Sequence, residues 1–357
     1  MTFKNKIKIY LFILLLFIFF LFDINISKNK NERKKLKIGV IGLMHTINIG
    51  NNLLKYAISI ILKEMGFIPY IIGTRLNNEN ISFINKTTNL IIIKNNFSEI
   101  KKDDYDILMV NSDQTWRKFD KNFLDYGFLK FAENWKIKKF IYGASLGFNY
   151  WRISKKDEIK AKNLLKKFNG ISIREKGSLS LIKKYFGINP EIVLDPTLLI
   201  NKKYYYNLIK NHPNNSKNND YIFVYKKYGP EQLKGFILKA SNELNYNIYN
   251  YKLNNKSKIE DFIYFLANSK AVITNSYHGT IFAIIFNKPF VSFSWKGSAG
   301  ERLNSLANLL RIKNRIICNN KIPETKLLIK PLNINIEILN KMKIKSINFI
   351  KKNLSIK

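Results

Sequence analysis

Residues 271–286 read AVITNSYHGTIFAIIF, and this stretch decides how the chain folds. A short apolar run at 271–274 is followed by a polar loop and then by a second apolar run from residue 280 to residue 286. The first run has the length of a buried strand, and the second continues as a helix that opens at Gly279 and Thr280. A strand, a loop and a helix in this order are typical of parallel α/β units.

The same alternation extends over most of the chain. Near the N-terminus, LKIGVIGL at 36–43 indicates a buried strand, and 51–65 has apolar residues at helical spacing before Gly66. Further strand-like runs, alternating with helix-like stretches, lie at 68–72, 90–93, 107–110, 140–142, 171–173, 221–225 and 290–293. This alternation predicts parallel, doubly wound α/β structure.

Chain length and a polar break predict the domains. A chain of 357 residues exceeds one core, and the stretch NHPNNSKNND at 211–220 interrupts the alternation. We therefore expect two Rossmann-like α/β domains facing a cleft, at 37–210 and 220–330. They are preceded by an N-terminal segment at 1–36 and followed by a helical tail at 331–357.

The N-terminal segment has the composition of a membrane anchor. Lys4, Lys6 and Lys8 precede an unbroken apolar run at 9–22, and a basic linker follows it. No small-x-small cleavage site follows the run, so an uncleaved anchor is favoured over a removed signal peptide or a buried helix. The richer downstream charge favours the cytoplasmic face of the membrane for the main body.

The chain is strongly basic. Lys and Arg number 61 against 25 Asp and Glu, a formal net charge of +36. The basic residues are scattered, and no zinc-finger, homeodomain or RNP pattern occurs, so the sequence does not favour nucleic-acid binding. The single cysteine, Cys318, excludes an intramolecular disulfide and a multi-thiolate metal site within one chain.

Polar residues that follow predicted strands are the candidates for chemistry, because ligands of such sheets bind beyond the carboxyl ends of the strands. His278 stands beside a helix N-terminus, where it can act as a proton donor or an anion contact, or else serve as a structural histidine. Asp113 is suited to orient a hydroxyl-bearing acceptor and Trp116 to stack on a sugar, although a turn cap and a core ring explain them equally well.

Three basic residues are candidates for anion binding. Arg174 follows the strand at 171–173 and suits a carboxylate or phosphate, with pairing to Glu175 or Asp195 as the alternative. Lys296 and Arg302 flank the turn at 297–300, which either closes over a phosphate or is an ordinary solvated turn. His45 and His212 are interpreted as structural. P-loop, dinucleotide, nucleophile-elbow and HExxH motifs are missing from the sequence.

Six segments in order resemble the polysaccharide pyruvyl transferase family, over about residues 38–310. They are NIGN at 48–51, SDQTW at 112–116, GASLG at 143–147, SIRE at 172–175, DPTLL at 195–199 and SYHG at 276–279. The resemblance implies two domains arranged as in the glycosyltransferase B fold. It also implies transfer of a pyruvyl group from phosphoenolpyruvate onto two sugar hydroxyls, which forms a cyclic ketal.

The resemblance also assigns roles to the candidates. It places the catalytic acid at His278 and donor contacts at Arg174 and Lys296. The positive charge of Arg302 and the helix start at Gly279 add both residues to the expected donor site of the C-terminal domain. The acceptor, a polysaccharide or lipid-linked glycan, is expected at Asp113, Gln114, Trp116 and Asn51. No cofactor or metal is expected besides phosphoenolpyruvate as co-substrate. A nucleotide-sugar glycosyltransferase and a non-catalytic polyanion-binding protein remain alternatives.

Overall fold

The structure is a computed structural model that describes the chain in segments. These are residues 35–43, 48–74, 83, 91–94, 96–118, 121–147, 153–213, 220–226, 231–254, 257–294, 298–318 and 321–355. The predicted anchor at 9–22 lies outside them. Within these segments, no helix combines the length and the apolar character needed to cross a membrane.

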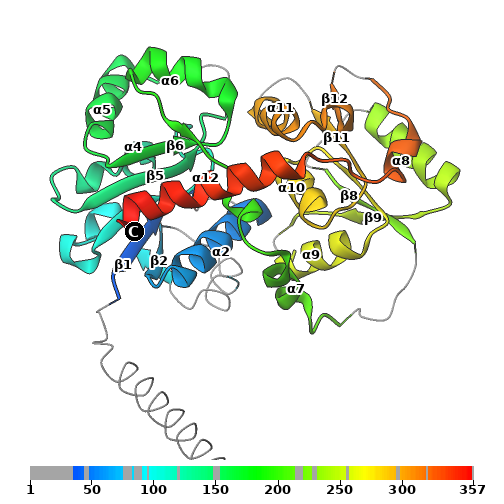
Figure 1. The fold of residues 1–357 in the computed structure, drawn as a ribbon, viewed down its shortest axis with the longest axis horizontal. Helices are drawn as coiled ribbons and strands as arrows, with labels where there is room; N and C mark the ends of the chain where they lie inside the picture. Colours follow the sequence, from blue (N-terminus) through cyan, green and yellow to red (C-terminus); the bar gives the residue numbers. More distant parts are fainter. Residues whose placement is uncertain are drawn as a thin grey trace, which may run out of the picture. The chain divides into compact units, whose positions relative to one another are not determined.

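The strands among the described residues form two sheets, and every recorded pairing is parallel (Figure 1). The seven-stranded sheet has the order β3-β2-β1-β4-β5-β6-β7, and the five-stranded sheet has the order β12-β11-β10-β8-β9. The first contains β1 (Lys37–Ile41), β2 (Ile68–Thr74), β3 (Ile91–Lys94), β4 (Ile107–Val110), β5 (Lys138–Ala144), β6 (Gly170–Ile173) and β7 (Glu191–Ile192). The second contains β8 (Tyr221–Tyr225), β9 (Asn247–Tyr251), β10 (Ala271–Thr274), β11 (Phe290–Ser294) and β12 (Ile316–Cys318). The predicted class of two parallel α/β sheets is confirmed.

Helices connect the strands, as parallel pairing requires. The α-helices are α2 (Ile49–Glu64), α4 (Phe123–Phe128), α5 (Lys155–Leu165), α6 (Leu179–Phe186), α7 (Lys202–Ile209), α8 (Glu231–Leu244), α9 (Ile259–Asn268), α10 (Tyr277–Ile285), α11 (Ser298–Leu310) and α12 (Ile336–Leu354). Short 3-10 turns include η4 (Lys176–Ser178) and η5 (Pro196–Leu198). At the carboxyl ends of the strands, loops therefore lead into the helices that follow.

The C-terminal helix α12 packs on the first sheet, although it follows the second sheet in sequence. Ser346 Oγ accepts a hydrogen bond from the Leu194 N–H at 2.9 Å, and the Phe349 ring contacts the rings of Phe140 and Tyr142. Figure 1 draws this helix in red beside β5. The helix thus covers a face of the sheet whose strands β4 and β6 lead into Asp113 and Arg174.

A continuous apolar cluster joins elements of both sheets. In it, the Tyr205 ring of α7 lies 4.9 Å from the Phe282 ring of α10 and 6.1 Å from the Tyr56 ring of α2, measured between centroids. Tyr56, Tyr205 and Phe282 are all buried. Burial of such large rings contributes a major share of core stability. This packing holds the start of α2 near the start of α10.

Candidate functional site

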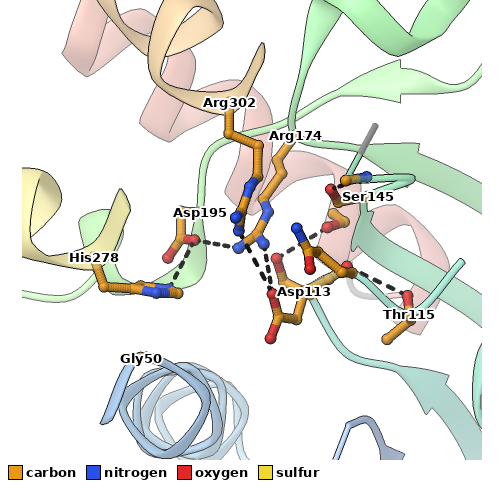
Figure 2. A network of polar contacts seen from close by, with 12 residues as sticks. Gly50, Asp113, Thr115, Ser145, Arg174, Asp195, His278 and Arg302 are labelled. Carbon is orange, nitrogen blue, oxygen red and sulfur yellow. Dashed lines mark hydrogen bonds and ion pairs between the residues drawn. The ribbon is translucent and has the colours of Figure 1, made fainter. Parts of the chain in front are cut away.

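Arg174 lies at the centre of the candidate site, directly after β6, with a side chain 1% exposed. Its Nη1 donates to Asp195 Oδ2 at 2.6 Å, and its Nη2 donates to Asp113 Oδ1 at 2.8 Å (Figure 2). Glu175 instead accepts a hydrogen bond from the Leu146 N–H. Arg174 therefore makes the ion pair with Asp195 that the sequence analysis weighed against ligand binding. Asp113 is a second partner that the sequence analysis did not predict.

The buried charges of this group stabilise one another. Burial by itself would raise the pKa of Asp195, but His278 and Arg174 hold it well below its usual value. Burial acts likewise on Asp113, whose pKa is nevertheless lowered by Arg174 and Arg302. Burial would lower the pKa of Arg174, and the two carboxylates raise it above its usual value instead. All three groups are therefore charged, and each depends on its partners to offset the loss of hydration.

Asp113 is held in an unusual backbone conformation. Its φ is 143°, a region that residues other than glycine rarely adopt, and it forms a β-bridge with Ala144 of β5. Next to it, the Trp116 N–H donates to the Ser145 carbonyl at 3.3 Å. The β-bridge and this hydrogen bond connect the loops after β4 and β5. The Asp113 carboxylate then lies within hydrogen-bond distance of Arg174. Strain of this kind is concentrated at functional sites.

His278 lies on the far side of Asp195 from Arg174 (Figure 2). Its Nε2 is 3.6 Å from Asp195 Oδ2, which is an ion-pair distance longer than a hydrogen bond. This nitrogen is buried and has no hydrogen-bond partner among the described residues. Burial lowers the pKa of His278 below 6.5, against the opposing effect of Asp195. The imidazole is therefore mainly neutral at pH 7 in the free protein.

The His278 ring also packs on the first turn of α2. A Cβ atom added to Gly50 would lie 1.9 Å from His278 Nδ1, so only a glycine leaves room for the ring at this position. Asn48 caps the helix by accepting a hydrogen bond from the Gly50 N–H at 3.0 Å. The first turn of α2, which belongs to the first sheet's domain, therefore forms one wall of the histidine's environment.

Helix α10 begins at Tyr277, two residues before the predicted opening at Gly279 and Thr280. Ser276 is its N-cap, and the Ser276 Oγ accepts a hydrogen bond from the Gly279 N–H at 3.4 Å. His278 is therefore inside the first helical turn. The Gly279 N–H is occupied in this cap, which differs from the expectation that it binds the donor. In the described part of the chain, the N–H groups of Tyr277 and His278 have no recorded acceptor and remain available for an anion.

Tyr277 brings the two arginines together. The guanidinium carbons of Arg174 and Arg302 lie 5.1 Å and 5.0 Å from the centroid of its ring, within cation–π distance. Arg302, on α11, is also 3.9 Å from Asp113 by its Nη1. Burial lowers the pKa of Arg302, and Arg174 lowers it further. Two guanidinium groups next to one another favour an anionic ligand.

Gln114 and Asn51 are both buried near this group. Gln114 Oε1 accepts a hydrogen bond from Arg117 Nη1 at 3.4 Å, while its buried Nε2 has no partner among the described residues. Asn51 lies in the first turn of α2, next to Gly50. Their acceptor roles stay predictions. Lys296, the remaining predicted donor contact, lies outside the described residues.

Trp116 is a core residue and not a sugar-stacking platform. It is 0% exposed, and its ring lies 5.6 Å from the Phe128 ring and 5.5 Å from the Phe186 ring. Its indole N–H donates to the Gly127 carbonyl at 3.1 Å. Because the ring is fully buried against Phe128 and Phe186 and its polar edge is engaged in the interior, the predicted contact with an acceptor sugar is wrong in this structure.

Sequence reasoning missed three participants. Asp195 was considered only as a partner of Arg174, yet it links Arg174 to His278. Tyr277 lies beside His278 in sequence, and the motif at 276–279 was the signal that could have found it. Gly50 could have been noted from the motif at 48–51, but its contact with His278 is purely tertiary.

A cavity of about 650 Å³ adjoins the ion pairs. Arg174, Asp195 and Tyr277 line it from the site, and side chains of α11 and α12, among them Ser305 and Met342, line it from elsewhere. Among the described residues, no cluster of three or more His, Cys, Asp or Glu side chains could hold a metal ion. The arrangement thus combines cationic groups, a buried histidine and space for a small ligand.

Comparison with protein families identifies the chain's relatives. The model for the polysaccharide pyruvyl transferase family matches residues 48–297, which contain both sheets apart from β1 and β12. The chain belongs to the polysaccharide pyruvyl transferase family. Among curated proteins, no sequence matches this pyruvyl transferase family member.

Solved structures with a similar fold include UDP-GlcNAc 2-epimerases. One is the UDP-GlcNAc 2-epimerase of Neisseria meningitidis bound to UDP-GlcNAc, with 10% identity, a TM-score of 0.51 and coverage of 89% of this chain and 99% of that chain. Another is the UDP-GlcNAc 2-epimerase of Methanocaldococcus jannaschii, with 14% identity, a TM-score of 0.53 and coverage of 86% and 93%. At these identities the likeness concerns the fold alone. It agrees with the predicted glycosyltransferase-B-like class for this family member.

Proposed function

We propose that the protein transfers a pyruvyl group from phosphoenolpyruvate to two hydroxyls of a sugar, so that a cyclic ketal forms. The acceptor is a cell-surface polysaccharide or its lipid-linked precursor. Family membership supports the transferase class. The observation that carries the specific reaction is the buried series His278, Asp195 and Arg174, in which a titratable imidazole and a guanidinium group lie on either side of one carboxylate.

The donor fits the charges of the site. Phosphoenolpyruvate has a carboxylate and a phosphate, and Arg174 and Arg302 place two guanidinium groups at one Tyr277 ring, with the charge of Arg174 shared with Asp113 and Asp195. The buried Arg174 Nε has no partner among the described residues and can donate to the donor. The available N–H groups at the start of α10 add a helix-terminus contribution. Lys296 is a further proposed contact.

His278 supplies the proton in the proposed reaction. A bound phosphate next to the imidazole would raise the pKa of His278, because a nearby negative charge favours the imidazolium. The protonated ring then gives its proton to the methylene carbon of the donor, and the central carbon becomes electrophilic. The first sugar hydroxyl adds there, phosphate leaves with the C–O electron pair, and the second hydroxyl closes the ketal. The reaction consumes phosphoenolpyruvate as co-substrate and needs no other cofactor.

A nucleotide-sugar glycosyltransferase is the second candidate, because solved structures of similar fold include UDP-GlcNAc enzymes. In this case Arg174 and Arg302 would bind a diphosphate. The predicted location, at the cytoplasmic face of the membrane, suits both candidates, since both draw on soluble cytoplasmic donors.

The test compares donors and histidine variants. The protein is incubated with phosphoenolpyruvate and a panel of lipid-linked and polymeric glycans, and phosphate release is followed; binding of UDP-sugars is measured in parallel. His278→Gln keeps a hydrogen-bonding side chain but cannot cycle a proton near neutral pH. We expect turnover to fall by about 10²- to 10⁴-fold in His278→Gln and His278→Ala.

His212 provides a matched control. It is also buried, it lies 2.9 Å by its Nε2 from Asp261 Oδ1, and it stacks on Tyr264. His212→Gln should retain turnover, because this histidine belongs to none of the contacts of the site. Near-normal turnover in His278→Gln together with a dead His278→Ala would make His278 an anion contact. UDP-sugar binding without phosphate release from phosphoenolpyruvate would favour the glycosyltransferase.

A further inference from the structure

Helix α2 has a polar stripe on a face that is buried. Asn51, Lys55 and Ser59 recur every fourth residue, so they share one face of the helix. They are 4%, 3% and 0% exposed. Polar groups in such a position destabilise the fold unless they have partners or a function. This stripe begins beside Gly50, against which the His278 ring packs.

The Lys55 amine is the reactive group of this stripe. No hydrogen bond or ion pair is recorded for it among the described residues, and its one recorded interaction is the attraction of the Asp113 carboxylate. Burial lowers the pKa of Lys55 to about 7, with Asp113 opposing the shift. A large fraction of this amine is therefore neutral, and able to accept a proton, near neutral pH.

The charged groups on the surrounding elements are few. Strand β2 (IPYIIGT) has none, Asp195 is the N-cap of η5, and α10 contributes His278 beside the start of α2. Asp113 follows β4, and its own charge is already offset by Arg174 and Arg302. Lys55 thus lies on the Asp113 side of the site, where the acceptor is expected.

The proposed reaction needs a base that the groups already described do not supply. Asp113 and Asp195 have lowered pKa values and are poor proton acceptors. His278 is engaged as the acid. A base works best when its pKa is near the working pH.

We propose that Lys55 is the general base that removes the proton from the acceptor hydroxyl, a role that rests on the proposed pyruvyl transfer. As the hydroxyl oxygen forms its bond to the central carbon of the donor, the O–H bond breaks and its proton passes to the Lys55 amine. His278 gives its proton to the methylene carbon. The departing phosphate accepts the proton of the second hydroxyl, and exchange with solvent restores Lys55 and His278.

The test uses Lys55→Met and Lys55→Arg in the full-length protein. Met has a similar length without charge or basicity, whereas Arg keeps the charge but cannot act as a base. Phosphate release from phosphoenolpyruvate is followed over about pH 5 to 9, with the acceptor that the wild type uses. Binding of phosphoenolpyruvate is measured by calorimetry, and folding by thermal melting.

We expect both variants to lose about 10²- to 10⁴-fold in turnover while they still bind phosphoenolpyruvate. In the wild type, activity should rise with pH at the acidic end, because Lys55 must lose its proton. Lys55→Met should lose this rise. Because the substrates ionise identically with both proteins, the difference between the two pH profiles reports on Lys55. Added small primary amines should restore part of the activity of Lys55→Ala, whose truncated side chain leaves room for the amine, and a purely structural role does not predict this rescue.

Three results would overturn the inference. Retained turnover in Lys55→Arg would make Lys55 a cationic contact and not a base. If turnover of Lys55→Met still rose with pH at the acidic end, the group that loses its proton there would be another residue. If Lys55→Arg misfolds, the amine rescue of Lys55→Ala is the deciding measurement, and failure of this rescue counts against Lys55 as the base. A wild type that releases no phosphate with any acceptor refutes the proposed function itself, whereas an active wild type with an unaffected Lys55→Met refutes only this inference.

Discussion

Replacement of Gly50 by alanine tests whether the position of the His278 ring is essential. The new Cβ would lie 1.9 Å from Nδ1 and 2.4 Å from two ring carbons, whereas real Cβ contacts stay beyond 3.0 Å. Gly50 belongs to α2, whose backbone is held by hydrogen bonds, so we expect the His278 side chain to move and the helix to keep its position. The imidazole is therefore expected to shift by about 1 Å, a misplacement that can reduce catalysis by about 10²-fold.

The effect on stability should be small in comparison. Alanine is favoured over glycine inside a helix by about 1 kcal/mol, which offsets part of the strain from the displaced ring. We therefore expect Gly50→Ala to lose about 10²-fold in turnover with a melting temperature close to that of the wild type. Turnover is measured as phosphate release, and the ring is followed by its imidazole NMR signals.

Gly235 in α8 offers a matched control. It is an exposed helical glycine whose added Cβ would meet no atom within 4 Å. Gly235→Ala should be neutral or slightly stabilising, with full turnover. If Gly50→Ala kept wild-type turnover and unshifted imidazole signals, the reasoning that ties catalysis to this ring position would be refuted.

Three more variants test separate parts of the structure. Asp195→Asn leaves Arg174 with one carboxylate, so we expect a loss of about 3 kcal/mol in unfolding free energy at pH 7 by chemical denaturation. The lowered pKa of Asp195 stabilises the fold above about pH 4 and less as pH falls further, so the difference from wild type should shrink in acid; a constant difference would contradict the ion-pair explanation. Trp116→Phe should lower the melting temperature, because the Gly127 carbonyl loses its donor, and leave the acceptor KM unchanged; a raised KM at unchanged melting temperature would restore the sugar-binding role. Deletion of residues 1–30 should release the protein from membranes, and a truncated protein that still sediments with membranes in high salt would show that the segment is not the anchor.

Local pattern was sufficient for much of the fold. The buried runs at β1, β4, β8 and β10 have the apolar composition of strands covered on both faces, and each was predicted within one or two residues. Strand β9 (NIYNY) was missed because it is an edge strand with mostly exposed side chains, so it has no apolar run. The early start of α10 was missed because Ser276 caps it by a side-chain bond that hydrophobic periodicity does not reveal.

By itself the sequence determined the two parallel α/β sheets, the family, and the positions at which polar residues follow strands. These features depend on the apolar period and on residues close in sequence, which a single chain displays directly. Only the tertiary structure decided that Trp116 belongs to the core, that α12 returns to the first sheet, that Gly50 contacts His278, and that Lys55 is buried. Such contacts join residues far apart in the chain. Whether a side chain is buried, paired or exposed is set by its neighbours in space, and no local pattern specifies those neighbours.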